Sequence, residues 1–289
     1  MIGTILQLLI SGIAMGFIYA LVAIEYTLIW NSTGLLNFSH DKIITVGAYI
    51  FAATFIIKFN MNKPLAIVLT FMLMGILGSV IASGIFNPLR HMRSNIFAVM
   101  GTMMLGRILA EAIRLIYGLV PFTIENWLSG TIKIGTLMVT KANVIICVVA
   151  ILVVAALQLF MNFTKIGKAM RCVAQNKKAA ALMGINVAQN ICVTTAVSSI
   201  ICSVIGMLII PLFNISTTMA ASIGLKGFSA GVIGGFGYLP GAILGGLFIG
   251  VVENLAVVVL PAVYKDIVSF VLLIIFLLVH PSGFLGKKA

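Results

Sequence analysis

The stretch "ANVIICVVAILVVAALQLFMN", Ala142 to Asn162, is apolar almost throughout and contains no charged side chain. About 20 such residues are needed for a helix to cross the hydrocarbon core of a bilayer. The run does not alternate between apolar and polar residues, as the strands of a membrane barrel do. A helix also satisfies its own backbone hydrogen bonds, which lipid requires. We therefore expect this stretch to be a transmembrane helix.

The rest of the chain has a similar composition. Of its 289 residues, 62% are apolar and only 8% are charged, whereas a soluble domain carries about 25% charged residues. We predict an all-α fold: one transmembrane domain over residues 1–289, a polytopic helical bundle of about eight to ten spans with broken or re-entrant glycine-rich helices. The predicted helices are 4–29, 43–58, 64–87, 95–118, 142–162, 188–211, 219–235, 240–259 and 265–280.

The net charge of +12 would suit nucleic acid, but the distribution of the basic residues argues against that partner. They cluster in short gaps between apolar runs, as the positive-inside rule describes. The gap from Thr164 to Ala179 holds five basic residues and no acid, and "NPLRHMRSN" holds Arg90 and Arg93. Both gaps should face the cytoplasm, and the connection from Leu119 to Lys141 should then lie outside.

The same counting predicts on which side of the membrane each end of the chain lies. Lys287 and Lys288 favour a cytoplasmic C-terminus, which agrees with the four crossings predicted after Lys178. Counting back places the N-terminus outside. Because the chain is apolar from Ile2 and has no basic segment before its first apolar run, we expect a retained span and not a signal peptide.

The basic segment from Thr164 to Val187 is predicted to contain a short amphipathic helix over about 168–182. It either lies on anionic lipid headgroups or docks into a partner protein, and its pattern alone does not decide between them. The expected apolar side is Met170, Val173, Ala174 and Ala181, and the expected polar side is Lys168, Arg171, Gln175 and Lys178.

Catalytic and nucleotide-binding motifs are missing from the sequence. There is no G-x-x-x-x-G-K-[ST] phosphate loop and no G-x-G-x-x-G segment. No histidine and cysteine cluster has metal-ligand spacing, and the three histidines are far apart in sequence. We therefore predict that the chain is not an enzyme and carries no cofactor or metal of its own. The four cysteines are expected to be small buried apolar residues.

Ten of the 28 glycines lie between Gly224 and Gly250. Gly234, Gly235 and Gly237 with Pro240 indicate a break between two helices. The four-residue spacings Gly237/Gly241/Gly245 and Gly246/Gly250 suit close helix packing, and lining of a solute path is the alternative.

Four segments in collinear order resemble one family. They are "GFIYALVAIEYTLIWNSTGLLNFSH" (16–40), "GKAMRCVAQNKKAAALMGINV" (167–187), "KGFSAGVIGGFGYLPGAILGG" (226–246) and "YKDIVSFVLLIIFLLVHPSGFLG" (264–286). They are similar to motifs of the branched-chain amino acid ABC permeases, of the H type, and the similarity covers nearly the whole chain. The second segment resembles the family's cytoplasmic coupling segment, G-R-A-x-R-A-x-A-x-x-x-x-x-A-x-x-x-G-I-N.

The resemblance implies a permease subunit of an ATP-driven importer in the bacterial inner membrane. It implies ABC ATPase subunits that use ATP and Mg, a second permease chain (M-type or identical), an extracytoplasmic solute-binding protein and surrounding membrane lipid as partners. The solute would be a small polar molecule, in first place a branched-chain amino acid. The residues expected to couple to the ATPases are Gly167, Lys168, Arg171, Ala174, Gly184 and Asn186.

The resemblance also changes the interpretation of "NSTGLLNFSHDKIITVGAY", residues 31–49. Composition alone makes it a cytoplasmic loop, whereas the family motif makes it a membrane-embedded break at the start of the second span. Such a break is tolerated where protein or a wet cavity covers it. The candidate solute-path residues are Glu25, Asn37, Ser39, His40, Lys226 and Glu253.

Three features depart from the family. Glu25 stands in the first span where the family usually has Gly, so it should be paired, protonated or facing a wet path. The pair Asp41-Lys42 replaces Gly-Glu, which suggests a different or modified solute. Arg107, Glu111 and Arg114 have the spacing of a charge ladder on one helical face. Either Glu25 reaches this ladder or the ladder faces another subunit.

A stand-alone secondary transporter or channel is the alternative function. It would need coupling-ion residues on its own spans. Glu25, Glu253 and the Arg107, Glu111 and Arg114 set are the candidates.

Overall fold

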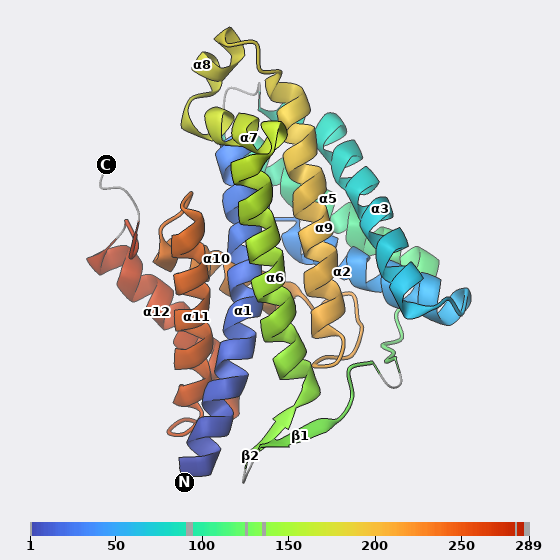
Figure 1. The fold of residues 1–289 in the computed structure, drawn as a ribbon, viewed down its shortest axis with the longest axis vertical. Helices are drawn as coiled ribbons and strands as arrows, with labels where there is room; N and C mark the ends of the chain where they lie inside the picture. The colour runs from blue at the N-terminus through green and yellow to red at the C-terminus, as the bar shows by residue number, and fades with distance from the viewer. Residues whose placement is uncertain (1, 91–94, 125–126, 135–136, 281, 286–289) are drawn as a thin grey trace.

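The computed structural model describes residues 2–90, 95–124, 127–134, 137–280 and 282–285. Figure 1 shows an elongated bundle in which most of the long helices run side by side. The elements of the first half are α1 (Ile2–Thr33), α2 (His40–Tyr49), η1 (Ile50–Lys58), α3 (Lys63–Ile81), η2 (Ala82–Phe86), α4 (Asn87–Leu89), α5 (Asn95–Tyr117), β1 (Thr131–Ile134) and β2 (Leu137–Thr140). Those of the second half are α6 (Lys141–Phe163), α7 (Lys165–Gln175), α8 (Lys177–Leu182), α9 (Val187–Ile209), α10 (Ala221–Gly234), α11 (Leu239–Ala256), η3 (Ala262–Tyr264) and α12 (Lys265–Val279).

Eight helical segments among the described residues are long and apolar enough to cross a membrane. They confirm the fold class and eight of the nine predicted spans. They are Gly3–Thr33, His40–Lys58, Lys63–Leu89, Ile96–Tyr117, Lys141–Phe163, Val187–Ile209, Leu239–Ala256 and Ala262–Val279.

The ninth predicted span, 219–235, is wrong as a complete span. Its helix, α10, has 14 residues and is therefore about 21 Å long, against a hydrocarbon core of about 30 Å. An irregular segment, 210–220, precedes α10, and Ile215 and Ala220 in it are fully buried. α10 is therefore a short helix, and an irregular, partly buried segment precedes it.

The packing of α1 against α11 is the most extensive helix contact in the described chain, and glycines make it possible. A Cβ built on Gly250 would lie 2.3 Å from Gly16 Cα, and one on Gly246 would lie 2.4 Å from the Ala20 nitrogen. Gly12 also faces Gly250 at close range. We call Gly12, Gly16, Gly246 and Gly250 the glycine seam. Its backbone-to-backbone contact supports the packing role predicted for Gly246 and Gly250.

Both predicted helix breaks are present. Gly235 has φ 102° and Gly237 has φ 92°, backbone conformations that glycine adopts readily, and they separate α10 from α11. The second break lies between Thr33 and His40, where the chain is irregular and largely buried. The membrane-embedded break inferred from the family motif therefore describes this segment better than an exposed loop does.

The two ends of the bundle differ in structure (Figure 1). α7 and α8 project at one end, and the N-terminus and the hairpin β1-β2 lie at the other. The hairpin is antiparallel, with Thr131 opposite Thr140. The segment predicted to be cytoplasmic and the hairpin and N-terminus predicted to be outside therefore lie at opposite ends of the bundle. Which end faces the cytoplasm stays a prediction of the positive-inside rule.

The predicted single amphipathic helix over 168–182 is wrong in two respects. The chain forms two helices, because the Asn176 side chain accepts hydrogen bonds from the backbone nitrogens of Lys178 and Ala179 and caps α8. Met170 and Val173 are buried as predicted, but Ala174 and Ala181 are exposed. The expected polar side is exposed at all four positions, Lys168, Arg171, Gln175 and Lys178.

Candidate functional site

A cluster of four side chains surrounds the carboxylate of Glu25, and we call Glu25, His40, Ser198 and Cys202 the histidine cluster. His40 Nδ1 forms an ion pair with Glu25 Oε2, and the Ser198 hydroxyl donates to Glu25 Oε1. The Cys202 sulfur completes a group in which the ligand atoms of Glu25, His40 and Cys202 lie within 4.8 Å of one another. None of the four side chains is more than 2% exposed.

The break between α1 and α2 brings His40 to Glu25. Asn37 Oδ1 accepts hydrogen bonds from the Ser39 backbone nitrogen at 3.0 Å and the Ser39 hydroxyl at 2.6 Å. The Phe38 nitrogen donates to Thr102 Oγ1 on α5 at 3.2 Å. These bonds replace the helical ones that the break removes, so Asn37 and Ser39 hold the irregular backbone within the protein.

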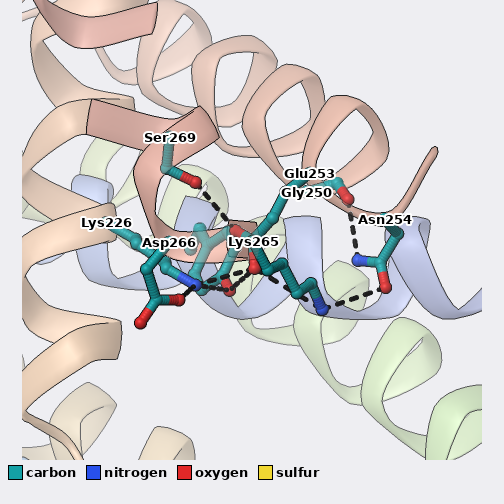
Figure 2. Close-up of polar contacts among 8 residues, drawn as sticks. Lys226, Gly250, Glu253, Asn254, Lys265, Asp266 and Ser269 are labelled. Carbon is teal, nitrogen blue, oxygen red and sulfur yellow. Dashed lines mark hydrogen bonds and ion pairs between the residues drawn. The ribbon is translucent and has the colours of Figure 1, made fainter. Parts of the chain in front are cut away.

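A second cluster joins α1, α10, α11 and α12 (Figure 2). We call Tyr19, Lys226, Glu253, Lys265, Asp266 and Ser269 the lysine cluster. Lys226 Nζ lies 2.7 Å from Glu253 Oε1 and 2.7 Å from Asp266 Oδ1. The two residues that the sequence analysis proposed separately, Lys226 and Glu253, are therefore direct partners.

The other members of the lysine cluster complete the environment of Glu253. Ser269 donates to Oε2 at 2.9 Å, and Tyr19 donates to Oε1 at 3.3 Å. Lys265 lies 3.5 Å from the same Oε1 and also donates to Asn254 at 3.1 Å. The Glu253 side chain is 1% exposed, whereas that of Asp266 is 58% exposed. The cluster is therefore balanced in charge and reaches the protein surface on one side.

The starts of α2 and α10 lie close together. Asp41 and Lys42 form an ion pair of 2.9 Å, and Lys42 Nζ donates to the Thr217 carbonyl at 3.3 Å. A Cβ built on Gly224 would lie 3.2 Å from Asp41 Cβ. Two helices that begin after irregular segments thus meet beside one partly exposed pair of opposite charges.

The proposed charge ladder on α5 does not reach Glu25. Glu25 contacts His40 and Ser198 instead, so this alternative for the ladder is wrong. Arg114 Nε lies 2.8 Å from Glu111 Oε2, and no ion pair joins Glu111 to Arg107 in the described part of the chain. All three side chains are exposed on the outside of the bundle.

Gly167 has a packing role at the corner between α6 and α7. A Cβ there would lie 2.3 Å from the Phe160 carbonyl oxygen and 2.4 Å from Met161 Cα. The Gly167 nitrogen donates to the Thr164 side chain at 2.9 Å, which starts α7. Gly167 therefore fixes the angle between the two helices and is buried.

The other predicted coupling residues lie along the projecting segment. Lys168, Arg171 and Ala174 are exposed on α7. Gly184 has φ 82° and Asn186 caps α9 by accepting from the Gln189 nitrogen at 3.1 Å, so both shape the return of the chain.

Lys177 ties the start of α8 to the bundle, because its Nζ lies near Gly34 at the end of α1. Burial, and to a smaller extent the nearby Arg90, lower the pKa of Lys177 from its ordinary value.

Sequence reasoning missed Ser198 and Cys202, and also Tyr19, Lys265, Asp266 and Ser269. A signal for the first two exists in the sequence. Thr194, Ser198 and Cys202 recur every four residues along the span 188–211, which places them on one helical face. Together with Glu25, this stripe indicates a polar contact between the two spans.

An apolar cavity of about 700 Å³ lies away from both clusters. It is lined by side chains of α3, α6 and α9 with Trp127 and Leu128. A second cavity of about 500 Å³ lies at the hairpin end and has a mixed lining that includes Thr123, Thr131 and Asn214.

Eight apolar helical spans in the described chain, two helix breaks and a projecting basic helix pair define a class of protein: a multi-pass helical membrane protein. Residues 8–277 match the family model described as branched-chain amino acid transport system / permease component. The chain belongs to this family, and the resemblance seen in its four motifs is confirmed.

Curated relatives agree with this assignment. The high-affinity branched-chain amino acid transport system permease protein LivH of Salmonella typhimurium is 30% identical, over 98% of this chain and 96% of the relative. BraD of Pseudomonas aeruginosa, described in the same words, is 31% identical with the same coverage. Such relatives are transport proteins and not enzymes, and they do not favour a stand-alone secondary transporter or channel.

A solved structure supports the fold. A chain of PsaBC from Streptococcus pneumoniae in complex with Fab matches with a TM-score of 0.52. The match covers 96% of this chain and 92% of that chain at 13% sequence identity.

Proposed function

We propose that this chain is the translocation subunit of an ATP-binding-cassette importer for a small polar solute, in first place a branched-chain amino acid. Family membership supports the class of transport. The structural observation that carries the proposal is the projecting pair α7 and α8, which offers a partner protein a surface at the cytoplasmic end. The solute path would open alternately to each side as that partner moves.

The tip of the projecting pair has the composition of a protein contact. Leu182 is 90% exposed and Met183 is 79% exposed, and the exposed Arg171 and Lys178 lie on the same segment. A loop lying on anionic lipid headgroups would bind through its basic side chains. The two large apolar side chains at the tip favour a different contact, insertion into a pocket on a protein. We propose that ABC ATPase subunits bind this tip and that they use ATP and Mg.

Gly167 transmits the motion in this proposal. Because α7 is packed against α6 without space for a side chain, a displacement of α7 moves the end of α6 with it. Lys168, Arg171 and Ala174 would face the ATPase, whereas Gly184 and Asn186 would shape the return into α9.

A second permease chain is proposed to cover the exposed face of α5. Arg107 lies near the middle of this 23-residue helix, and an exposed charge at that depth is costly in lipid. Glu111 and Arg114 extend the charged face from Arg107 toward the C-terminal end of α5. A partner permease chain with complementary polar groups would remove this cost.

At the opposite end, the hairpin and the 500 Å³ cavity beside it are the proposed contact for an extracytoplasmic solute-binding protein. Membrane lipid is proposed to cover the remaining apolar surface, including the 700 Å³ cavity.

The meeting of α2 and α10 is the proposed place where the solute passes. Helix N-termini that begin inside a membrane favour anionic groups, and an amino acid has a carboxylate. Asp41 and Lys42, with side chains 21% and 17% exposed, add one charge of each sign for a zwitterion. Asn37, Ser39 and His40 are fully buried, so their contribution would be to hold the break in position.

The test is ATP-dependent uptake of leucine by proteoliposomes that contain this chain with its ATPases, second permease and binding protein. The double substitution Leu182→Ser/Met183→Ser should reduce ATPase co-purification and uptake at least tenfold. Val263→Ser, at a position 87% exposed near the start of α12, is the matched control and should change neither. Uptake by this chain alone, driven by an ion gradient, would overturn the proposal.

A further inference from the structure

The histidine cluster contains the three kinds of side chain that bind zinc in proteins: a carboxylate, an imidazole and a thiol. We propose that Glu25, His40 and Cys202 form a binding site for one divalent cation of the zinc type. This site is independent of the proposed function, because it concerns binding to the chain itself.

The geometry of the cluster is suitable for a single ion. The three ligand atoms lie within 4.8 Å of one another, so a point exists within about 2.8 Å of all of them. Zinc bonds to oxygen, nitrogen and sulfur measure about 2.0 to 2.3 Å. Small side-chain movements would therefore bring all three ligand atoms to bonding distance of one ion. The ligands come from α1, α2 and α9, and an ion bound there would join these three helices.

The charges of the cluster are also suitable. A carboxylate and a thiolate together neutralise a divalent cation, and the imidazole binds as the neutral form. The resulting complex has no net charge, which is the condition that a buried position in a membrane protein favours. A cation with hard oxygen preference, such as Mg²⁺, would not suit the sulfur ligand.

His40 provides an independent indication of a ligand. One ring nitrogen faces Glu25, but Nε2 is buried and has no hydrogen-bond partner among the described residues. Buried polar nitrogens are normally paired. If the ring turned to place Nε2 on a metal ion, Nε2 would gain a partner.

Ser198 supports the site from outside the set of ligands. Its hydroxyl donates to Glu25 Oε1, the oxygen opposite the one that faces His40. Hydrogen bonds of this kind orient metal-binding carboxylates. The Tyr26 ring packs edge-on against His40 with centroids 3.9 Å apart and restricts the orientation of the imidazole.

The experiment uses the purified full-length chain in detergent, with Co²⁺ as a spectroscopic substitute for zinc. We expect one Co²⁺ per chain and a thiolate-to-cobalt charge-transfer absorption, both removed by competing Zn²⁺. Cys202→Ser should abolish the charge-transfer band. Cys172→Ser and Cys192→Ser, which change cysteines outside the cluster, are the matched controls and should retain it.

A second variant keeps the test decisive if Cys202→Ser does not fold. Glu25→Gln has the same shape as the native residue and lacks the carboxylate, so it should weaken Co²⁺ binding at least tenfold. Wild-type protein without a charge-transfer band would overturn the proposal. A band that survives Cys202→Ser, or unchanged affinity in a folded Glu25→Gln variant, would also overturn it and leave the cluster as an ion pair only.

Discussion

The histidine cluster and the lysine cluster both place a carboxylate inside the bundle, and both involve α1, but they stabilise it differently. Glu253 contacts both Lys226 and Lys265, and Asp266 pairs with Lys226. Glu25 has one histidine and one serine. A lysine side chain is ordinarily charged throughout the physiological pH range, whereas the ordinary pKa of an imidazole lies near neutral pH. The lysine cluster therefore rests on several lysine–carboxylate ion pairs, whereas the histidine cluster rests on one histidine–carboxylate contact and one serine hydrogen bond.

The clusters also differ in their access to the surface. Asp266 is more than half exposed, so the lysine cluster extends from the interior to the outside of α12. Every side chain of the histidine cluster is enclosed. A substitution in the lysine cluster should accordingly have effects that depend on how far from the surface the altered residue lies.

The largest effect is expected for Lys226→Met. This change leaves Glu253 buried with only Lys265 as a distant cation, and breaking a buried ion pair costs about 3–5 kcal/mol. Thermal unfolding in detergent, followed by circular dichroism, measures the loss. Lys265→Met is the matched control, and it should cost less because Lys265 lies 3.5 Å from Glu253 and is 27% exposed.

The double variant Lys226→Met/Glu253→Met sharpens the same result. Removing both charges should recover part of the loss, because neither group is then left unpaired. Unfolding temperatures that fall by the sum of the two single effects would show that the pair does not interact as the structure indicates.

A smaller effect is expected for Glu25→Gln than for Glu253→Gln. The Gln amide can still accept a hydrogen bond from Ser198 and contact His40, so the cost should be that of a weakened buried hydrogen bond, about 1–3 kcal/mol. The two amide variants are compared by thermal unfolding in the same detergent, without added metal. Equal or greater destabilisation by Glu25→Gln would contradict the distinction between the clusters.

The smallest effect is expected for Asp266→Asn. Its side chain is exposed enough for water to screen the pair with Lys226, and such pairs contribute about 0–1 kcal/mol. The unfolding temperature should change little, and added salt should reduce the difference further. A loss as large as that of Lys226→Met would mean that Asp266 is buried in the assembled protein.

The spans and breaks were predictable because they depend on local sequence. A run of apolar residues such as 142–162 specifies a membrane helix by itself, and Gly235 and Gly237 adopt the positive φ angles that a break requires. α10 was predicted to be too long because the apolar residues before it, around Ile215, do not distinguish a helix from a buried irregular segment. Asn176 interrupts an alanine-rich helix through its side chain, which propensity alone does not reveal.

The clusters were only partly predictable because their members are far apart in sequence. Glu25 stood out as an acid in a span, but its contact with Cys202 depends on how α9 packs against α1. Lys226 and Glu253 were identified one at a time, and only the fold pairs them. Asp266 lies beside Lys265 at the start of α12, where it resembled part of a family motif.

The glycine seam has a mechanical consequence. With backbone atoms of α1 and α11 in contact at Gly16 and Gly250, neither helix can slide past the other without a collision. They should move as one rigid strut. Since α1 contributes residues to both clusters, the α1–α11 pair connects to α9 through one cluster and to α12 through the other, and we expect any gating motion to leave this pair intact.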